Sequence, residues 1–136
     1  ALESMAARLA AERASPADIA ELHSLMDDFR SGNSGTRLDD YSDANIAFHQ
    51  AIIRMSGCTL LGEMTENLFI HMRAIRKITI HQDNRAVRSI VDHLAIIAAL
   101  ENRDAERAGR LAREHALGLA AHVEAHGDFL DAAASQ

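Results

Sequence analysis

Apolar residues recur at helical spacing along almost the whole chain, and this periodicity limits its fold more than any other feature. Short breaks divide the pattern into six segments, and no segment has the alternation expected of a strand. Alanine is abundant, β-branched runs are scarce and the 136 residues include one proline, a composition that favours helices. The sequence therefore predicts an all-α protein, an antiparallel bundle of about six helices that forms a single domain over residues 1–136.

The breaks between the segments give the expected helix boundaries. Ser15 is a typical N-cap, followed by Pro16 at the first helical position and Asp18 at the third. Residues 31–35 form the clearest loop, and Asp104 is expected to cap the last helix. The helices are expected at about Leu2–Glu12, Pro16–Arg30, Leu38–Met55, Leu60–His81, Arg85–Glu101 and from Asp104 to His126, with residues 132–136 frayed. The first helix is expected to bury a stripe of Leu2, Met5, Ala6 and Leu9.

Charge and cysteine content exclude several classes of protein. A net charge of −6 with neutral histidines argues against binding of nucleic acid by this chain itself. The single Cys58 rules out an internal disulfide and fits a reducing compartment. There is neither an apolar run of about 18 residues nor a signal-peptide pattern. We therefore expect a soluble cytoplasmic protein that makes no contact with a membrane.

Three histidines and one asparagine fall on the apolar faces of their predicted helices. Asn45 and His49 lie one turn apart on the third helix, His93 lies on the fifth and His115 on the sixth. One inward histidine is more often a core residue than a ligand, but three imidazoles and an amide oxygen together suit Zn²⁺ or Ni²⁺. From the residues alone, a metal site and a coincidence in a histidine-rich chain remain equally open.

Other polar residues on apolar faces are further candidates. Arg76 lies on the apolar face of the fourth helix, where a guanidinium needs an anion. Arg73 lies at the edge of that face and is expected to be exposed, whereas His71 is expected to point inward. His122 and His126 share a face of the last helix, where a packed or partly hydrated histidine is the more common outcome than one lining a cavity.

Several sequence motifs follow one another along the chain. They are Asn45-Ile-Ala-Phe48-His49, Met55-Ser-Gly57 with Leu60-Leu61, Asp92-His93 with Ala99, Asp104-Ala-Glu-Arg-Ala108 and Ala112-Arg-Glu-His115. Together with the opening segment Leu2–Ala7, they resemble the signature of the FadR-type C-terminal (FCD) effector-binding domain of GntR-superfamily bacterial transcriptional regulators. The resemblance covers essentially the whole chain.

This resemblance implies a function and assigns residues to it. The positions that correspond to metal ligands in the family are Asn45, His49, His93 and His115. The residues expected to contact an effector are Arg76, Arg73, His71 and His122, with Arg76 the best match for the family's carboxylate-binding arginine. The family also implies a homodimer that binds DNA through an N-terminal winged helix-turn-helix, which is absent from this chain.

Two residues depart from the family pattern. Asn45 stands where an aspartate is commoner, and Cys58 stands in place of the usual asparagine after Gly57. An amide keeps an oxygen donor but removes one negative charge. We therefore expect weaker metal affinity and a stronger attraction between the metal and an anionic effector.

Three functions are consistent with these observations. The favoured one is an effector-sensing and dimerisation domain that binds a small organic acid at a divalent metal and controls DNA binding allosterically. A metal-dependent hydrolase is the first alternative, but no carboxylate is expected on the inward faces beside the histidines to act as a general base. A metal-free dimerisation module is the second. We therefore expect a regulator domain that is not an enzyme.

Overall fold

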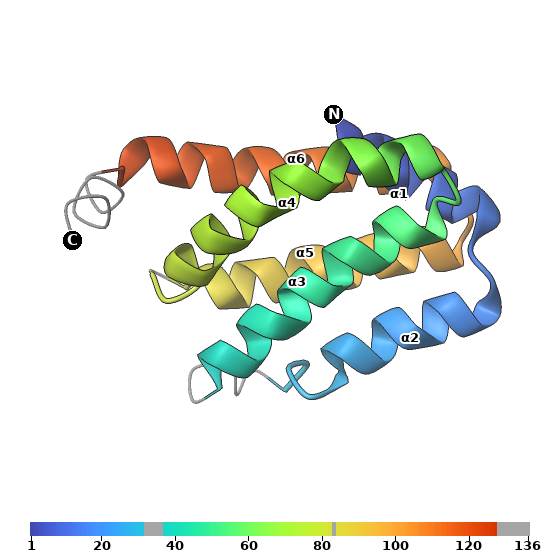
Figure 1. Ribbon diagram of the computed structural model, residues 1–136. Coiled ribbons are helices and arrows are strands. Elements are labelled where there is room, and N and C mark those ends of the chain that lie inside the picture. The colour runs from blue at the N-terminus through green and yellow to red at the C-terminus, as the bar shows by residue number, and fades with distance from the viewer. Residues whose placement is uncertain (32–36, 83, 128–136) are drawn as a thin grey trace.

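The computed structural model describes residues 1–31, 37–82 and 84–127. Within these ranges the chain forms six helices and no strand: α1 (Leu2–Arg13), α2 (Pro16–Asp27), α3 (Leu38–Met55), α4 (Thr59–Thr79), α5 (Arg85–Glu101) and α6 (Ala105–Ala125). Consecutive helices run in roughly opposite directions, so the expected all-α antiparallel bundle is confirmed (Figure 1). Most of the predicted 31–35 loop and all of the segment 132–136 lie outside the described residues.

The predicted N-caps of α2 and α6 are confirmed. The Ser15 hydroxyl accepts a hydrogen bond from the backbone N–H of Asp18 at 3.1 Å, and the Asp18 carboxylate accepts one from the Ser15 N–H at 2.8 Å. This reciprocal pair is a capping box. At the start of α6, the Asp104 carboxylate accepts a hydrogen bond from the Arg107 N–H at 3.0 Å. Both helices therefore begin where their side chains satisfy free backbone N–H groups.

Helix α1 packs closely on α6 through small residues. Its buried residues are Ala6, Ala7, Ala10 and Ala11. The Ser4 hydroxyl donates to the Gly109 carbonyl at 2.8 Å, and a Cβ at Gly109 would lie 2.5 Å from Arg8 Cγ. Met5 is 49% exposed, so its place in the predicted buried stripe is wrong. The alanine face allows a closer approach to α6, and that face is buried instead.

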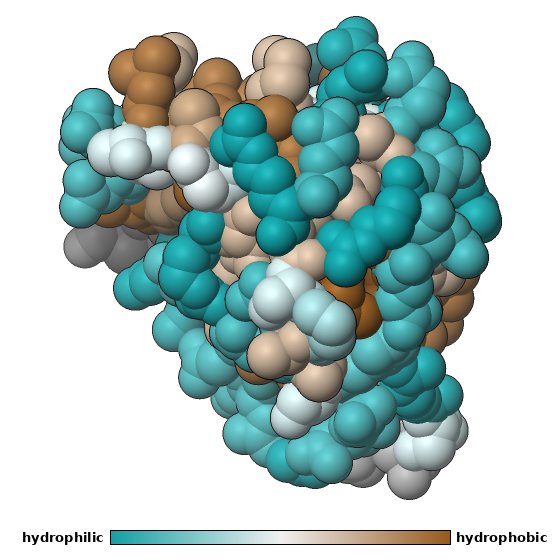
Figure 2. Space-filling model, turned by 90° about the vertical axis from the view of Figure 1, so that its right-hand side faces the viewer, coloured by the Kyte–Doolittle hydropathy of each residue, from teal (hydrophilic) through white to brown (hydrophobic). Residues whose placement is uncertain are grey.

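Helix α4 lies on the outside of the bundle. It packs on α3 and, less extensively, on the start of α1, and it leaves large apolar side chains exposed. These are Leu60, Met64, Leu68, Ile70 and Ile78. Apolar side chains gather at the upper left of Figure 2, on the side where α4 lies. His71 is exposed, so the prediction that it points inward is wrong: on a helix covered from one side, apolar neighbours do not identify the buried face.

The interior between α3, α5 and α6 holds aromatic rings beside the polar residues. Phe48 and Tyr41 are fully buried, and the Phe48 ring stacks on the His93 ring with 4.0 Å between centroids. Because α3, α5 and α6 each present one histidine to this interior, the fold brings distant parts of the chain together. None of the described helices is long and apolar enough to cross a membrane.

Candidate metal centre

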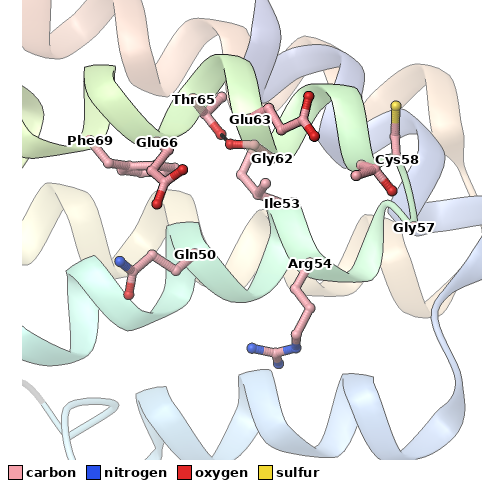
Figure 3. A pocket seen from close by; sticks show the side chains of 11 residues that line it. Gln50, Ile53, Arg54, Gly57, Cys58, Gly62, Glu63, Thr65, Glu66 and Phe69 are labelled. Atoms are coloured by element: carbon pink, nitrogen blue, oxygen red, sulfur yellow. Dashed lines mark hydrogen bonds between the residues drawn. The ribbon is translucent and has the colours of Figure 1, made fainter.

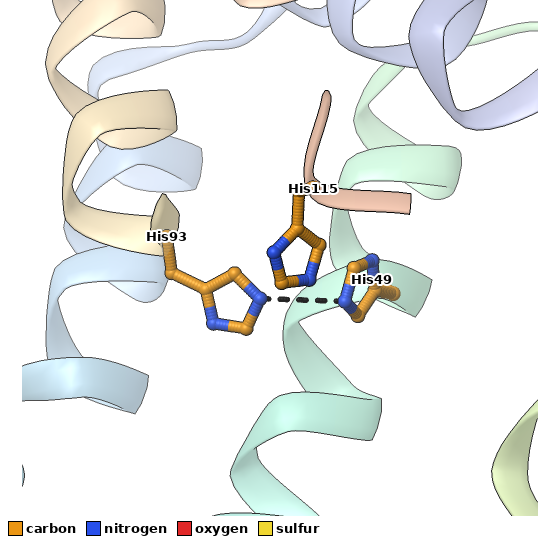
Figure 4. A group of neighbouring side chains, drawn as sticks. All are labelled: His49, His93 and His115. Atoms are coloured by element: carbon orange, nitrogen blue, oxygen red, sulfur yellow. Dashed lines mark hydrogen bonds between the residues drawn. The ribbon is translucent and has the colours of Figure 1, made fainter. Parts of the chain in front are cut away.

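Three histidines from three helices converge inside the bundle. His49 comes from α3, His93 from α5 and His115 from α6, and all three side chains are buried (Figure 4). Their ring centroids lie 4.7 to 5.2 Å apart, and one ring nitrogen of each lies within 4.8 Å of the others. The inward direction predicted for these residues from helical spacing is confirmed.

Carboxylates hold the outer nitrogens of two of these rings. His49 Nδ1 lies 2.9 Å from Glu3 Oε1 at the start of α1, and His115 Nδ1 lies 2.9 Å from Asp92 Oδ2 on α5. A carboxylate accepts hydrogen bonds, so Nδ1 is the protonated nitrogen in both rings. Such carboxylate–histidine pairs orient the histidines of metal sites and make them better ligands.

The third ring is held by a tyrosine. The Tyr41 hydroxyl donates to Ser89 Oγ at 2.8 Å, so its oxygen accepts from His93 Nδ1 at 3.2 Å. His93 therefore also takes the tautomer with its proton on Nδ1.

With the protons on Nδ1, the Nε2 atoms of His49 and His93 present lone pairs toward each other. His49 Nε2 and His93 Nε2 lie 3.3 Å apart, the contact drawn in Figure 4. Two nitrogens bound to one Zn²⁺ at about 2.0–2.1 Å lie about 3.0–3.4 Å apart. Two facing lone pairs repel each other unless a proton or a metal ion lies between them. The arrangement therefore fits a divalent metal.

Asn45 supplies a further oxygen on the same helix face. It lies one turn before His49, is 3% exposed, and its Oδ1 accepts no hydrogen bond from any described residue. A buried polar atom without a partner is uncommon and needs an explanation. A metal bound by the three histidines would explain it, because an amide oxygen is a suitable additional ligand.

Burial keeps His49 and His93 neutral. Burial, reinforced by the charge of Arg76 and opposed by Glu3, lowers the pKa of His49 to about 4. Burial also lowers the pKa of His93 well below its ordinary value. Both rings are therefore unprotonated near pH 7, the state in which imidazole binds a metal.

Glu3 is the residue that the sequence did not reveal as part of this site. Arg76 is only 3% exposed, and its Nη2 donates to Glu3 Oε1 at 2.9 Å. The anion that Arg76 required is thus supplied from the chain itself. The expectation that no carboxylate lies beside the histidines is wrong, because the side chains of Glu3 and Asp92 reach the histidines from the edges of their helices.

The charge on Glu3 is stabilised by its partners. Burial raises the pKa of the Glu3 carboxyl, but the charges and hydrogen bonds of His49 and Arg76 outweigh it and hold the pKa well below its usual range. At neutral pH, Arg76 provides the positive charge and the neutral His49 provides an N–H donor. Glu3, His49 and Arg76 therefore form one largely buried network, in which Glu3 is partly exposed.

The other predicted effector-binding residues lie apart from this network. His122 is buried, contacts Gln82 Oε1 at 2.7 Å and stacks on His126. Arg73 is exposed, as expected, and borders a shallow hollow beside Lys77. Neither these residues nor the exposed His71 line the cavity next to the histidines.

The enclosed space at the cluster is small. A cavity of about 10 Å³ lies beside Glu3, His49 and His115, closed by apolar residues. This volume holds about one water molecule. An organic effector therefore needs a side chain or helix to move before it reaches the histidines.

A larger hollow of about 600 Å³ lies between α3 and α4 (Figure 3). Its polar lining includes Gln50, Glu63 and Glu66, and none of the clustered histidines borders it. Arg54 turns away toward α2, where its Nη2 donates to Glu21 at 2.7 Å. This hollow is therefore a feature distinct from the histidine cluster.

Comparison with known families identifies the domain. Residues 1–118 match the family model of the FCD domain. The chain belongs to the FCD domain family. The resemblance to GntR-type regulators found in the sequence is thereby confirmed.

Individual FCD relatives are similar to the chain over most of its length. The HTH-type transcriptional repressor RspR of Escherichia coli K12 is 25% identical over 115 residues, which are 85% of this chain and 50% of the relative. An uncharacterized HTH-type transcriptional regulator of Shigella flexneri, YdfH, matches with the same values. The chain spans about half the length of the curated relatives it matches. Both relatives are named as transcriptional regulators rather than as enzymes, in agreement with the expectation for this FCD domain.

A solved structure shares the fold. E. coli McbR/YncC superposes with a TM-score of 0.70 at 25% identity, covering 89% of this chain and 63% of that one. The FCD helical bundle is therefore shown by a family match and by a structural one.

The pKa values predict how the metal-free domain responds to acid. A histidine whose pKa is lowered by folding takes up its proton first in the unfolded chain, so chelator-treated protein loses stability as pH falls from about 6.5 toward 4. His49 alone should lower the free energy of unfolding by about 2 kcal/mol between pH 7 and pH 5. Urea unfolding at the two pH values measures the loss. His49→Gln should make this loss smaller, whereas His81→Gln, at an exposed histidine, should leave it unchanged. Equal losses in the unaltered protein and both variants would refute the claim that His49 causes the loss.

Proposed function

We propose that this chain is the effector-sensing domain of a transcriptional regulator and that His49, His93 and His115 bind a divalent metal, with Asn45 as a fourth donor. The observation that supports this most strongly is that every Nδ1 has an acceptor while one ring nitrogen of each histidine lies within 4.8 Å of the others. When bound, the metal would supply a Lewis-acidic anchor for an anionic group. Three imidazoles and an amide oxygen suit Zn²⁺ or Ni²⁺.

The proposed effector is a small organic acid. Arg76 is buried beside the cluster, and the contacts of the Glu3 carboxylate with Arg76 and His49 support a carboxylate-binding position. Arginine binds carboxylates in a planar two-point geometry that adds specificity. In this proposal, Arg76 and the metal together recognise the acid group of the effector.

The signal would pass from the bundle to a DNA-binding part of the intact regulator. The match covers only half of the length of each relative, and the relatives are named as HTH-type regulators. The exposed apolar side chains of α4 support a homodimer, because such patches commonly mark protein interfaces. Binding of the effector would shift helices within each domain and so alter the spacing of two DNA-binding parts.

Metal content tests the proposal. Protein purified without a histidine tag or added metal should contain about one equivalent of Zn²⁺ or Ni²⁺ by elemental analysis. His115→Ala should lose most of it, and the exposed control His81→Ala should retain it. Less than about 0.1 equivalent in the unaltered chain would instead support a metal-free dimerisation module.

Substitution of Asn45 should change metal retention and effector affinity in opposite directions. Asn45→Asp restores a negative donor, so resistance to removal of the metal by a chelator should rise about tenfold, while affinity for acetate should fall. Asn67→Asp on exposed α4 changes net charge equally and serves as the control. Chelator competition and calorimetry measure the two effects. Unchanged values in Asn45→Asp would show that Asn45 does not contact the metal.

A further inference from the structure

Glu3 separates two spaces in the domain. On one side lies the cavity of about 10 Å³ beside His49 and His115, and Glu3 lines it. On the other side lies a pocket of about 240 Å³ between the start of α1 and the middle of α4, which Glu3 also lines. The two helices lie next to each other in this region (Figure 1). The Glu3 side chain therefore stands between the histidine cluster and the larger pocket.

The Glu3 carboxylate holds partners that a bound acid would also need. It accepts hydrogen bonds from His49 Nδ1 and Arg76 Nη2, both at 2.9 Å. Both contacts to the arginine use Nη2, so the two-nitrogen fork that a free carboxylate can engage is not used by Glu3. A carboxylate arriving from the pocket could take over Arg76 with better geometry.

The pocket itself is apolar. Its lining consists of Ala1, Leu2, Glu3, Thr65, Leu68, Phe69 and Met72. Glu3 is the one acidic or basic side chain in this lining, and the Thr65 hydroxyl already donates to the Leu61 carbonyl at 2.7 Å. Hydroxyl groups of a ligand that are buried against this lining would lack hydrogen-bond partners, which disfavours a ligand rich in them.

The size of the pocket suits a small apolar group. A closed cavity of about 150 Å³ lined by apolar residues binds benzene, so about 240 Å³ is sufficient for a short alkyl chain or one ring. The Phe69 ring lines this pocket and also lies 6.0 Å from the Arg76 guanidinium. The apolar lining and the carboxylate partner are thus adjacent.

We propose that the Glu3 carboxylate is an internal substitute for the effector's acid group, and that the effector is a monocarboxylate with an apolar body. Its carboxylate displaces Glu3 from Arg76 while its apolar body fills the pocket between α1 and α4. The inference rests on the proposed function, and it adds the chemical class of the effector and the residue that competes with it.

Hexanoate, gluconate and hexanamide are three probes that separate the contributions of the acid and the body. Titration of the whole chain by calorimetry should show hexanoate binding at least about tenfold tighter than gluconate, because unpaired hydroxyl groups are costly in the apolar pocket. Hexanamide has the apolar body without the charge and should also bind weakly. Equal affinities for hexanoate and gluconate would overturn the assignment of the effector class.

Substitution of Glu3 tests the competition. If Glu3 occupies the effector's position, Glu3→Ala should bind hexanoate about tenfold more tightly than the unaltered chain, since one charge-assisted hydrogen bond no longer has to be displaced. Glu21→Ala removes a carboxylate from the exposed pair with Arg54 and is the matched control, with no expected change. Unchanged or weaker hexanoate binding by Glu3→Ala would contradict the proposal.

The loss of a buried charge partner could also unfold the Glu3→Ala protein, and two measurements cover this case. Recovery of the folded state with millimolar acetate, followed by circular dichroism, would support the proposal because acetate then replaces the missing carboxylate. If acetate does not restore folding, Glu3→Gln tests the competition instead, because it keeps the side-chain volume. This variant should bind hexanoate more tightly than the unaltered chain. No gain in Glu3→Gln would refute the competition.

The same titrations on chelator-treated protein distinguish this inference from the proposed metal site. An affinity gain in Glu3→Ala that persists without metal would support displacement of Glu3 even if the purified chain contains no metal. Normal metal content without any affinity gain would refute displacement alone and leave the metal site intact.

Discussion

The hydrogen bonds at the outer histidine nitrogens determine what the interior of this FCD domain can do. Glu3, Asp92 and Tyr41 fix the protons of three rings on Nδ1, and the bundle brings one ring nitrogen of each histidine within 4.8 Å of the others. The remaining lone pair of a buried imidazole normally accepts a hydrogen bond from a nearby donor. Here the three rings lie together, and a divalent cation would satisfy all three at once, as proposed above.

The helices and the inward histidines could be predicted because both depend on local periodicity. The capping box at Ser15 and the positions of His49, His93 and His115 follow from residue spacing alone. Two other predictions failed for reasons outside local periodicity. Met5 is exposed because a face of small alanines packs on α6, and His71 is exposed because α4 has neighbours on one side only.

The role of Glu3 could not be found from helical phase. Its carboxylate meets residues from α3 and α4 that are far away in the sequence, and it does so with a long side chain at the edge of α1. One sequence signal pointed toward such a partner, namely the inward Arg76, which needs an anion. The nearby carboxylates also remove one argument against hydrolase chemistry, whereas the relatives named as regulators favour sensing. In the proposed mechanism, Glu3 connects the first turn of α1 to the metal site and to the effector.

Anomalous diffraction from crystals of the chain purified without added metal tests the central claim most directly. Data collected at the zinc and nickel absorption edges should place one peak at about 2.0–2.1 Å from the Nε2 atoms of His49, His93 and His115. An interior without an anomalous peak, or a peak located at His122 and His126 instead, would contradict the account.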